Sequence, residues 1–329
     1  MPALLRPAFA AALASAIALA LFAARLLPPA LRWPCTLFHE FEPFWMLGGP
    51  ILLSLAFCGR RDQRGRLALV LAGALTILAF AVHGDALFER APERPNSRAP
   101  ETLRVATWNL GDVIAPADRA VAGISALGAD IVALQEVSSQ NRSAIESQLK
   151  HLYPHQEYYG AGLDGTALLT RAPLQDRGLI APPGFRPMIR GKVDFSGRSV
   201  EVRVAHLSPF TGFLGTRARR GTHVEVLTQG VAALGPALLV GDLNSTERNG
   251  ACELLQDAGW LDAWSVRGAG LGWTFPVPGR WRLGPIGPLV AIDHIRHTEH
   301  LEPIAVWLER DDASDHFPLV ADLRWRERP

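Results

Sequence analysis

Three long apolar runs fill the first 83 residues of the 329-residue chain, at about 4–27, 41–58 and 67–83. A helix of about twenty apolar residues crosses the hydrocarbon core of a bilayer, and each run approaches that length with its flanks. A cleaved signal peptide would explain the first run, with its basic start and small residues, but not the other two. The sequence therefore favours a transmembrane region of three helices over residues 1–83.

The loop between the second and third runs predicts the orientation of these helices. It carries four Arg within the eight residues 59–66, and basic loops of this kind stay on the cytoplasmic side. Three crossings then place the rest of the chain outside the cytoplasm. Residues 84–100 are polar and rich in proline, which is typical of a linker. We therefore expect a separate domain over 101–329 that is held near the membrane surface.

The composition indicates the type of organism and membrane, and it bears on whether the chain binds nucleic acid. Arg greatly outnumbers Lys, and Ala, Leu and Pro are abundant, which is typical of a GC-rich bacterium, so we expect the bacterial cytoplasmic (inner) membrane with a periplasmic or extracellular domain. Residues 101–329 carry 23 Lys and Arg against 26 Asp and Glu. General nucleic-acid binders are strongly basic, so this mildly acidic domain does not favour that class. The three cysteines show no metal-finger spacing.

From residue 101 onwards, strand-like and helix-like segments alternate. We expect strands at 103–108, 131–134, 165–170, 191–195, 199–205, 237–240, 289–295, 304–307 and 319–323. We expect helices at 117–127, 139–149, 216–234 and 250–258. Ser196-Gly197 joins two of the strands as a hairpin, and Gly128 ends the first helix. Hairpins mixed with helices predict an α/β sandwich rather than a ladder of βαβ units.

The buried strand at 237–240 runs directly into Gly241-Asp242-Leu243-Asn244. A carboxylate and a carboxamide two residues apart lie on the same rim of a sheet. An Asp can take a proton from water, and an Asn can hold the water or a phosphate oxygen beside it. The same residues also form ordinary turns, so the meaning of this motif depends on the other strand ends.

Five other segments carry polar residues of the same kind. They are Thr107-Trp108-Asn109-Leu110, Leu134-Gln135-Glu136-Val137, Ala205-His206-Leu207-Ser208, Ile292-Asp293-His294-Ile295 and Ser314-Asp315-His316-Phe317. Each alone has a structural explanation as a cap, a turn or a hydrogen-bonded histidine. Six such segments together predict a hydrolytic site at one edge of the sheets.

The series TWNL, LQEV, GTALLTR, VAHLSP, GDLNS, AIDHI and SDHFPL, in this order over about 101–325, closely resembles the endonuclease/exonuclease/phosphatase superfamily. This superfamily includes DNase-I-like nucleases, inositol-polyphosphate phosphatases and neutral sphingomyelinases. The resemblance implies an α/β fold, a four-layer α/β/β/α sandwich, with the site at one edge of the two packed sheets.

The resemblance also implies a metal site for Mg²⁺ or Mn²⁺. Glu136 would be the principal ligand, with Asn109 beside it and Asp315 close by. Carboxylate oxygens suit these hard cations, which keep several of their waters. Some nuclease members have an Asp two residues after the first-strand Asn, where this chain has Gly111. Whether Asp112 reaches the metal is left open.

The remaining implied roles concern water and phosphate. Asp242 would orient or deprotonate the attacking water, and Asn244 would position water or phosphate. His206 and His316 would donate hydrogen bonds to the phosphoryl oxygens, and Asp293 would orient His316 and fix its tautomer. His294, the next residue on the strand, should point to the opposite face. Three arginines fit either a phosphate contact or a solvated helix face: Arg217, Arg219 and Arg220.

These observations favour a membrane-anchored, metal-dependent phosphohydrolase that cleaves a phosphoester or pyrophosphate of a lipid-linked substrate. Its expected partners are the lipid bilayer and a phosphorylated lipid. The architecture is similar to that of membrane-bound bacterial members linked to glycopeptide resistance, which act on undecaprenyl pyrophosphate. One alternative is an extracytoplasmic nuclease or phosphodiesterase acting on DNA or RNA, which predicts a basic groove. An inactive, membrane-tethered binding module is a remote alternative, because every expected catalytic residue type is in place.

Overall fold

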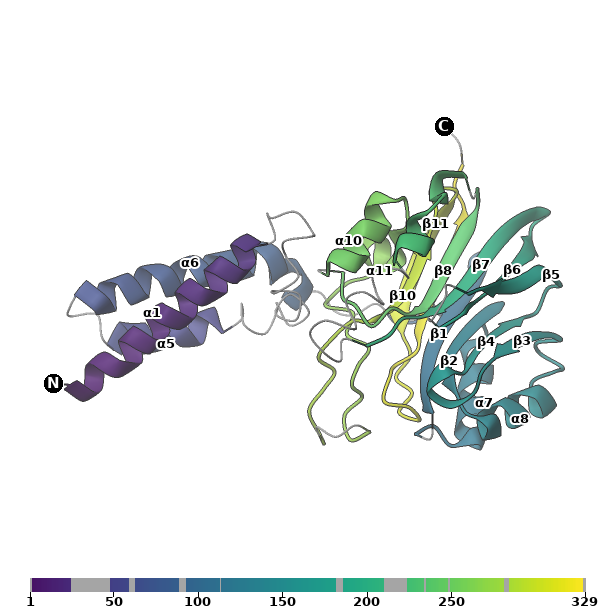
Figure 1. Ribbon diagram of the computed structural model, residues 1–329, viewed down its shortest axis with the longest axis horizontal. Helices are drawn as coiled ribbons and strands as arrows, with labels where there is room; N and C mark the ends of the chain where they lie inside the picture. The colour runs from purple at the N-terminus through teal and green to yellow at the C-terminus, as the bar shows by residue number, and fades with distance from the viewer. Residues whose placement is uncertain are drawn as a thin grey trace. The chain divides into compact units, whose positions relative to one another are not determined.

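The computed structural model describes residues 2–24, 48–58, 63–88, 93–112, 114–181, 186–209, 224–233, 235–247, 249–280 and 284–327. They form two compact units, a first that runs through Glu89 and a second that begins at Arg90. The first unit contains α1 (Pro2–Ala23), α5 (Gly49–Cys58) and α6 (Gln63–Phe88), and each of these helices packs against the other two (Figure 1).

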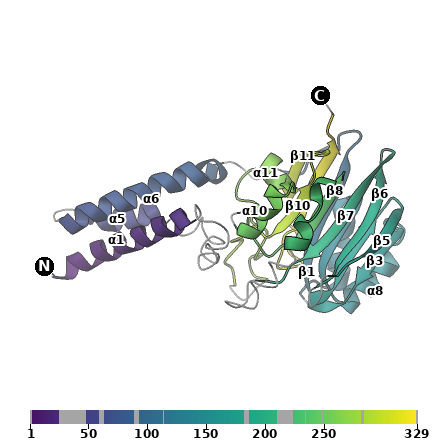
Figure 2. The same cartoon turned by 45° about the horizontal axis from the view of Figure 1, so that its top comes forward.

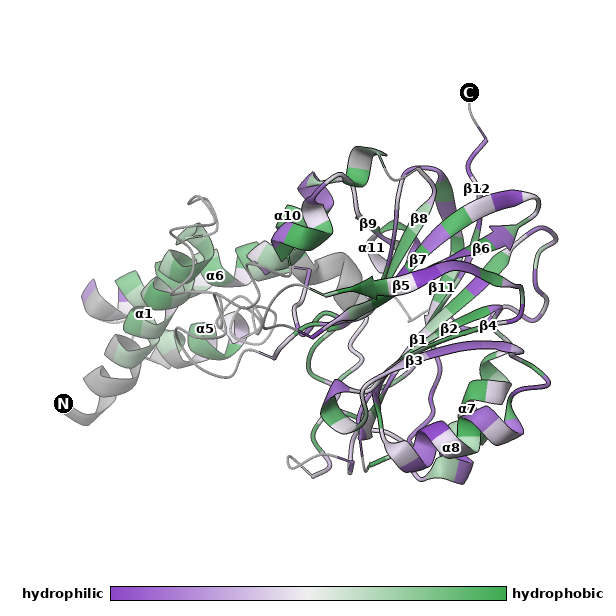
Figure 3. Cartoon of the chain, turned by 45° about the vertical axis from the view of Figure 1, so that its right-hand side comes forward, coloured by the Kyte–Doolittle hydropathy of each residue, from purple (hydrophilic) through white to green (hydrophobic). Residues whose placement is uncertain are grey.

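The first unit buries small residues and exposes large apolar ones. Its buried apolar positions are mostly alanines: Ala11, Ala18, Ala56, Ala68, Ala72, Leu75 and Ala79. Its exposed surface carries Leu13, Ile17, Ile51, Phe57, Leu67, Val70, Ile77 and Phe80. Hydrophobic residues dominate all three helices in Figure 3. A water-exposed helix bundle has the reverse arrangement, with large apolar side chains inside and polar ones outside.

By length and composition, Gly65–Val82 is the one segment among the described helices that could cross a membrane, and Ala10–Ala23 is a shorter apolar helix. The third predicted apolar helix, 67–83, lies within the longer α6. The start of the second, at 41, and the end of the first, beyond residue 24, fall outside the described residues. The three-span membrane region therefore stays a prediction.

The second unit contains two six-stranded mixed sheets (Figures 1 and 2). Sheet A has the order β11-β12-β1-β2-β4-β3, with β1 (Leu103–Asp112), β2 (Ile131–Val137), β3 (His155–Tyr159), β4 (Thr166–Thr170), β11 (Leu301–Leu308) and β12 (Leu319–Trp325). Sheet B has the order β5-β6-β7-β8-β10-β9, with β5 (Leu174–Ile180), β6 (Met188–Phe195), β7 (Arg198–His206), β8 (Ala237–Asp242), β9 (Leu261–Asp262) and β10 (Asp293–His297). The pairs β1–β2 and β7–β8 are parallel.

Three apolar clusters hold the layers of this unit together. One lies between the two sheets and takes residues from both. A second joins sheet A to α7 (Ala117–Leu127) and α8 (Ser139–Gln148), which carry both hydrophobic and hydrophilic residues in Figure 3. The third joins sheet B to α10 (Gly250–Asp257). This α/β arrangement with two mixed sheets is consistent with the expected sandwich.

Several local predictions are confirmed. The helix at 117–127 has the expected bounds and ends at Gly128, which adopts φ 61°. The expected hairpin joins β6 to β7 through Ser196 and Gly197. The strand expected at 289–295 begins only at Asp293. Only residues 224–233 of the helix expected at 216–234 are described, and 224–228 are helical. The strands β3, β5 and β9 and the short helix α11 (Ala263–Arg267) were not predicted.

A buried ion pair joins the two strands at the centre of sheet A. Arg104 of β1 faces Asp322 of β12 in register, and its Nε and Nη2 donate to the two carboxylate oxygens at 2.7 and 2.8 Å. Trp307 lies beneath the guanidinium, 4.9 Å from ring centroid to Cζ. Both charged groups are almost fully buried, so each depends on the other for its neutralisation.

Replacing Asp322 by Ala should therefore destabilise the second unit strongly. Removing one partner of a buried ion pair costs about 3–5 kcal/mol, because the other charge stays buried without compensation. Chemical denaturation of the full chain in detergent, followed by tryptophan fluorescence, measures the loss. The double variant Arg104→Met, Asp322→Leu removes both charges and should recover most of it. A single variant as stable as the parent would contradict this account of the pair.

Candidate active site

The candidate site lies at the strand ends, where the side chains that point between the two sheets change from apolar to polar. Alternate residues of the central strands point into the layer between the sheets: Leu103, Val105, Val202, Val204, Leu238, Val240 and Ile295. Asn109, His206 and Asp242 continue this alternation at the ends of β1, β7 and β8, and Asp293 begins it on β10. Asp293 pairs in register with Asp242. The inter-sheet core therefore ends in polar side chains at one edge.

Glu136 reaches the same edge by a break in the strand pattern. Leu134 packs in the cluster between sheet A and its helices, so regular alternation would point Glu136 there as well. Its φ of 53° turns the chain instead. The carboxylate then accepts a hydrogen bond from Asn109 at 3.3 Å and lies 3.7 Å from Nε2 of His206. A left-handed conformation at a non-glycine residue is unfavourable and is often found at functional sites.

Asn109 links the two sheets across this edge. Its Nδ2 donates to Oδ2 of Asp242 at 2.9 Å, and its Oδ1 accepts from the backbone N–H of Gly111 at 2.9 Å. Asn109 therefore presents its amino group to the carboxylates and orients them, and its predicted role as a metal ligand stays a prediction.

Gly111 stands where some nuclease members carry an Asp, and the backbone accounts for the glycine. It adopts φ 64°, and a Cβ there would lie 2.7 Å from Oδ1 of Asp315. Asp112 next to it adopts φ 49°, and its carboxylate lies beside Gly162. The position two residues after Asn109 is therefore closed to a carboxylate side chain by Asp315.

The turn at Gly241-Asp242-Leu243-Asn244 is fixed by close contacts. Gly241 pairs with Ala205 in the parallel ladder, and a Cβ at Gly241 would lie 1.9 Å from the Ala205 oxygen. Asn244 adopts φ 48°. Its N–H donates to Oδ1 of Asp242 at 2.7 Å, and its Nδ2 donates to the Leu207 oxygen at 2.9 Å. The Asp242 carboxylate is thereby oriented through both of its oxygens.

Asp293 and His316 form a buried hydrogen-bonded pair. Oδ2 of Asp293 lies 2.8 Å from Nδ1 of His316, so Nδ1 donates and Nε2 is directed elsewhere. Phe275 lies against the imidazole with ring centroids 4.6 Å apart. Trp108 donates through Nε1 to the His316 backbone oxygen at 2.9 Å. The histidine is therefore held by its side chain and by its main chain.

His206 is contacted by a cation that sequence reasoning missed. Nη1 of Arg186 lies 3.1 and 3.0 Å from the two ring nitrogens of His206, and its Nε donates to Asp164 at 2.6 Å. Arg186 precedes β6, whose register with β7 brings it beside His206. The strand was predicted to begin at Gly191, so Arg186 was not next to any predicted element. A strand predicted from Met188 would have placed Arg186 beside the end of β7.

Burial among these carboxylates shifts several pKa values. Burial, together with the neighbouring charge of Asp293, raises the pKa of Asp242 to about 7. Burial also raises the pKa of Glu136 and that of Asp315. For His316, burial alone would lower the pKa, but Asp293, Asp242 and Asp315 raise it to about 10. The site therefore holds an imidazolium among carboxylates that resist ionisation in the absence of further positive charge.

These side chains fit a divalent metal ion. Burial raises the pKa of Glu136, and the charge of Asp315 adds to this effect. Asp293 Oδ1 is buried and has no hydrogen-bond partner within the described part of the chain. Asp242, Asp293 and His316 also bring ligand-type atoms within 4.8 Å of one another, although Nδ1 of His316 already donates to Asp293. Carboxylate oxygens gathered in this way suit a hard cation.

The structure thus brings together all eight residues expected at the site: Asn109, Glu136, His206, Asp242, Asn244, Asp293, Asp315 and His316. His294 lies on the other face of β10, as the alternation of the strand predicts, and bonds to Ser245 and Asp262 there. The arginines at 217, 219 and 220 lie outside the described residues. Ser314 was not predicted, and its Oγ donates to the Asn109 oxygen at 2.7 Å.

Two packed mixed sheets with carboxylates and histidines at one edge define a layered α/β hydrolase of phosphate esters. Residues 106–316 match the model of the Endonuclease/Exonuclease/phosphatase family, and the chain belongs to this family. Its members are phosphoester hydrolases, and this chain is therefore assigned as a hydrolase of that superfamily. No curated protein matches the chain in sequence.

Solved structures share the fold of the second unit. An endonuclease/exonuclease/phosphatase from Beutenbergia cavernae is 22% identical at a TM-score of 0.57, covering 68% of this chain and 72% of that one. D. rerio TDP2 complexed with single strand DNA product is 19% identical at a TM-score of 0.56, and the match covers 68% of this chain and 99% of that one. The 3' phosphatase NExo from Neisseria bound to product DNA hairpin is 19% identical at a TM-score of 0.53, and the match covers 68% of this chain and 100% of that one. At these identities the likeness shows the fold alone.

The raised pKa values predict how the stability of the metal-free protein depends on pH. Folded Asp242 keeps a proton up to about pH 7, whereas an Asp in the unfolded chain loses its proton at about pH 3.9. Folded His316 keeps its proton to about 10, against about 6.5 in the unfolded chain. In both intervals the folded state binds more protons, so the free energy of unfolding should fall as pH rises.

Denaturation of the full chain in chelator across pH 4 to 10 measures these slopes. The Asp242→Asn variant should flatten the lower interval and His316→Gln the upper one, each relative to the parent protein. Curves for the two variants that run parallel to that of the parent throughout would contradict the assignment of these protons.

Proposed function

We propose that the chain is a Mg²⁺- or Mn²⁺-dependent phosphohydrolase, anchored in a bacterial membrane, with its catalytic unit outside the cytoplasm. Its substrate would be a phosphoester or pyrophosphate carried by a lipid. The observation that carries the lipid assignment is the first unit, whose three helices expose large apolar side chains and bury alanines. Lipid is the solvent in which such a surface is favourable.

The metal ion would be held by Glu136 and Asp315, with Asn109 orienting Glu136 through the amide that also contacts Asp242. When bound, it would neutralise charge on the phosphate oxygens and on the leaving group. The same positive charge would favour the ionised carboxylates whose pKa values burial raises.

The remaining residues would handle the water and the phosphoryl oxygens. Asp242, oriented by Asn109 and Asn244, would accept a proton from the attacking water. Without a metal its pKa is raised to about 7, and a bound cation would favour the ionised form, which can accept the proton at neutral pH. His316 donates through Nδ1 to Asp293, so its Nε2–H would donate to a phosphoryl oxygen. This charged donor stabilises the negative charge that develops in the transition state.

Arg186 would contribute positive charge next to His206. Arg186 contacts the imidazole through Nη1, and His206 Nε2 lies 3.7 Å from Glu136 and 3.8 Å from Asp242. A guanidinium next to a histidine donor attracts phosphate and remains charged at any working pH.

Orientation and charge support a lipid-linked substrate outside the cytoplasm. The four Arg at 59–66 favour a cytoplasmic loop between α5 and α6. The short linker after α6 would keep the catalytic unit near the bilayer surface, where a lipid head group is presented. The mild excess of acidic over basic residues in 101–329 gives no general attraction for a nucleic-acid backbone.

A nuclease or phosphodiesterase acting on nucleic acid is the second candidate. What favours it is that two of the similar structures contain DNA, namely TDP2 with a single strand DNA product and NExo with a product DNA hairpin. The same carboxylate and histidine set would serve either substrate, so the two candidates differ in what binds beside the site.

Full-length protein in detergent with Mg²⁺ should release phosphate from undecaprenyl pyrophosphate, assayed in parallel with a phospholipid and with plasmid DNA. The Asp242→Asn and His316→Ala variants should each lose on the order of 10² to 10⁴ in kcat, because each removes a proton-transfer or charge-stabilising group. His297→Gln, which replaces a buried histidine of strand β10, controls for folding. Cleavage of DNA without phosphate release from lipid would instead support the second candidate.

An alkaline-phosphatase fusion after residue 100 should be active, because that enzyme folds only outside the cytoplasm and the proposed topology places residue 100 there. A fusion after residue 62, in the Arg-rich loop, should be inactive and serves as the matched control. The reverse pattern of activities would put the catalytic unit in the cytoplasm.

A further inference from the structure

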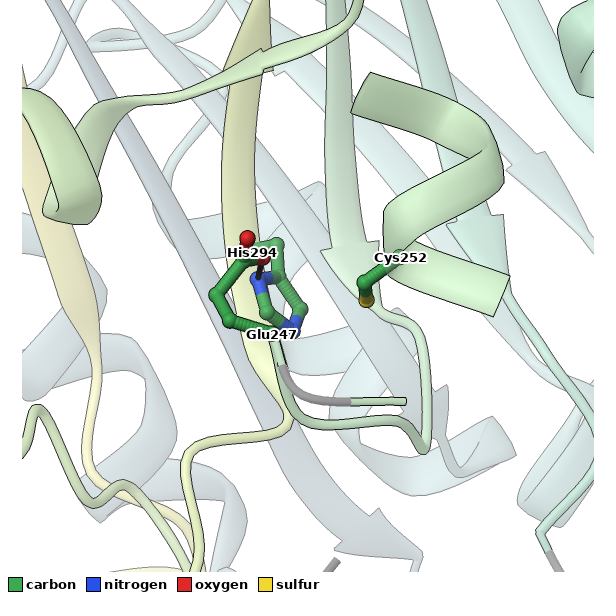
Figure 4. Close-up of side chains that lie close together, drawn as sticks. All are labelled: Glu247, Cys252 and His294. Atoms are coloured by element: carbon green, nitrogen blue, oxygen red, sulfur yellow. Dashed lines mark ion pairs between the residues drawn. The ribbon is translucent and has the colours of Figure 1, made fainter. Parts of the chain in front are cut away.

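A second cluster of ionisable side chains lies on the outer face of sheet B. His294 and Arg296 of β10 point to this face, which α10 covers with Cys252. Glu247 joins them from the segment after β8, and Asp262 from β9. Figure 4 shows Glu247, Cys252 and His294 close together on this face. None of these five residues takes part in the chemistry described above.

The contacts of His294 show which of its nitrogens carry protons. Nε2 lies 2.7 Å from the backbone oxygen of Ser245, and Nδ1 lies 3.2 Å from Glu247 and 3.3 Å from Asp262. A carbonyl oxygen and a carboxylate both accept hydrogen bonds. Both ring nitrogens therefore donate, and His294 is an imidazolium. Burial alone would lower its pKa, but Cys252, Asp262 and Glu247 raise it well above the usual value.

The charges of the cluster are balanced. Arg296 donates to Glu247 and, at 3.0 Å, to the Trp260 oxygen. Asp262 accepts from His294 through one oxygen and from the N–H of Ser265 at 2.8 Å through the other. Two cations thus neutralise two carboxylates in a buried setting, which is the condition under which buried charges are tolerated.

The same atoms have the composition of a zinc site, since Cys252 Sγ, a Glu247 oxygen and a His294 nitrogen lie within 4.8 Å of one another. Their arrangement opposes metal binding. The sulfur contacts the Ser245 oxygen at 3.7 Å, on the Nε2 side of His294, whereas Glu247 lies at Nδ1 (Figure 4). A metal ion would have to displace a proton from His294 and Arg296 from Glu247.

We propose that this outer cluster positions the catalytic turn through the hydrogen bond from His294 to Ser245. Ser245 directly follows Asn244, whose left-handed backbone is held on the inner side by Asp242 and Leu207. The bond from His294 holds the next peptide from the outer side. The turn is thereby fixed from both faces of sheet B. The effect on catalysis rests on the proposed function, whereas the effect on the turn does not.

A matched pair of substitutions separates this bond from the rest of the cluster. In His294→Gln the side-chain amide can replace Nε2 and donate to Ser245, whereas in His294→Asn the shorter amide replaces Nδ1 and loses that bond. Both variants remove the same positive charge from the same buried position. They should therefore lose similar stability, while the Gln variant keeps the bond to Ser245 and the Asn variant keeps a donor toward Glu247 and Asp262.

Steady-state kinetics of the full chain on the lipid pyrophosphate then test the positioning role. His294→Asn should lose about 10²-fold in kcat with KM within about threefold of the parent, as expected when a reacting group is misplaced by about 1 Å. His294→Gln should recover most of this loss. Equal kcat values in the two variants would overturn the proposal.

Amide hydrogen exchange at residues 243–246 gives a readout that does not depend on turnover. Exchange should be faster in His294→Asn than in His294→Gln, because only the former frees the Ser245 peptide. This result in a protein that hydrolyses none of the substrates would support the positioning bond and reject the proposed function. Equal exchange rates in the two variants would overturn the positioning bond itself.

Cys252→Ser tests the metal alternative. With zinc added, the parent and this variant should show the same thermal shift and retain the same amount of metal after dialysis. Zinc stabilisation of the parent that Cys252→Ser abolishes would overturn the proposal and assign the outer cluster as a metal site.

Discussion

The alternation of side chains along strands packed face to face is the constraint on which the site depends. Residues that point into the layer between the sheets are apolar along most of each strand and polar at one end. On β7, β8 and β10, the inward positions next to the apolar ones are His206, Asp242 and Asp293. On β1, Thr107 lies between the apolar Val105 and Asn109. The bond from Asn109 to Asp242, at 2.9 Å, then joins one sheet to the other. The packing of the two sheets that stabilises the fold thus also brings the side chains of the candidate site together.

Charge is the second constraint, and it acts against folding. Four carboxylates meet at this edge, and burial raises the pKa of three of them, Glu136, Asp242 and Asp315. The His316 imidazolium offsets part of this cost within the chain. A bound divalent cation would offset the remaining cost of burying these carboxylates. On the outer face of sheet B the chain uses the opposite solution, since Arg296 and His294 balance Glu247 and Asp262 without a metal.

Much of this arrangement could be predicted from sequence, because it depends on local patterns. The bounds of α7, the hairpin between β6 and β7, and the opposite orientations of Asp293 and His294 follow from periodicity and turn residues. The family motifs, taken in order, indicated all eight residues that meet at the edge of the sheets. Edge strands such as β5 were missed because Gln175, Asp176 and Arg177 interrupt any apolar run.

What the sequence could not supply are the contacts between distant segments. The left-handed turn at Glu136 contradicts the strand alternation that would otherwise place it on the wrong face. Arg186 belongs to no motif and reaches His206 because β6 begins at Met188, whereas the strand was predicted to begin at Gly191. The partners of His294 come from two separate segments, and only the folded chain brings Ser245 and Glu247 together with Asp262 around it.

The most direct test of the central claim is the position of a bound metal. Crystals of the full chain soaked in Mn²⁺ and measured at the manganese absorption edge would locate it by anomalous scattering. The account predicts a peak between the sheets, in contact with Glu136 and Asp315. A peak at Glu247, Cys252 and His294 with none between the sheets would contradict it.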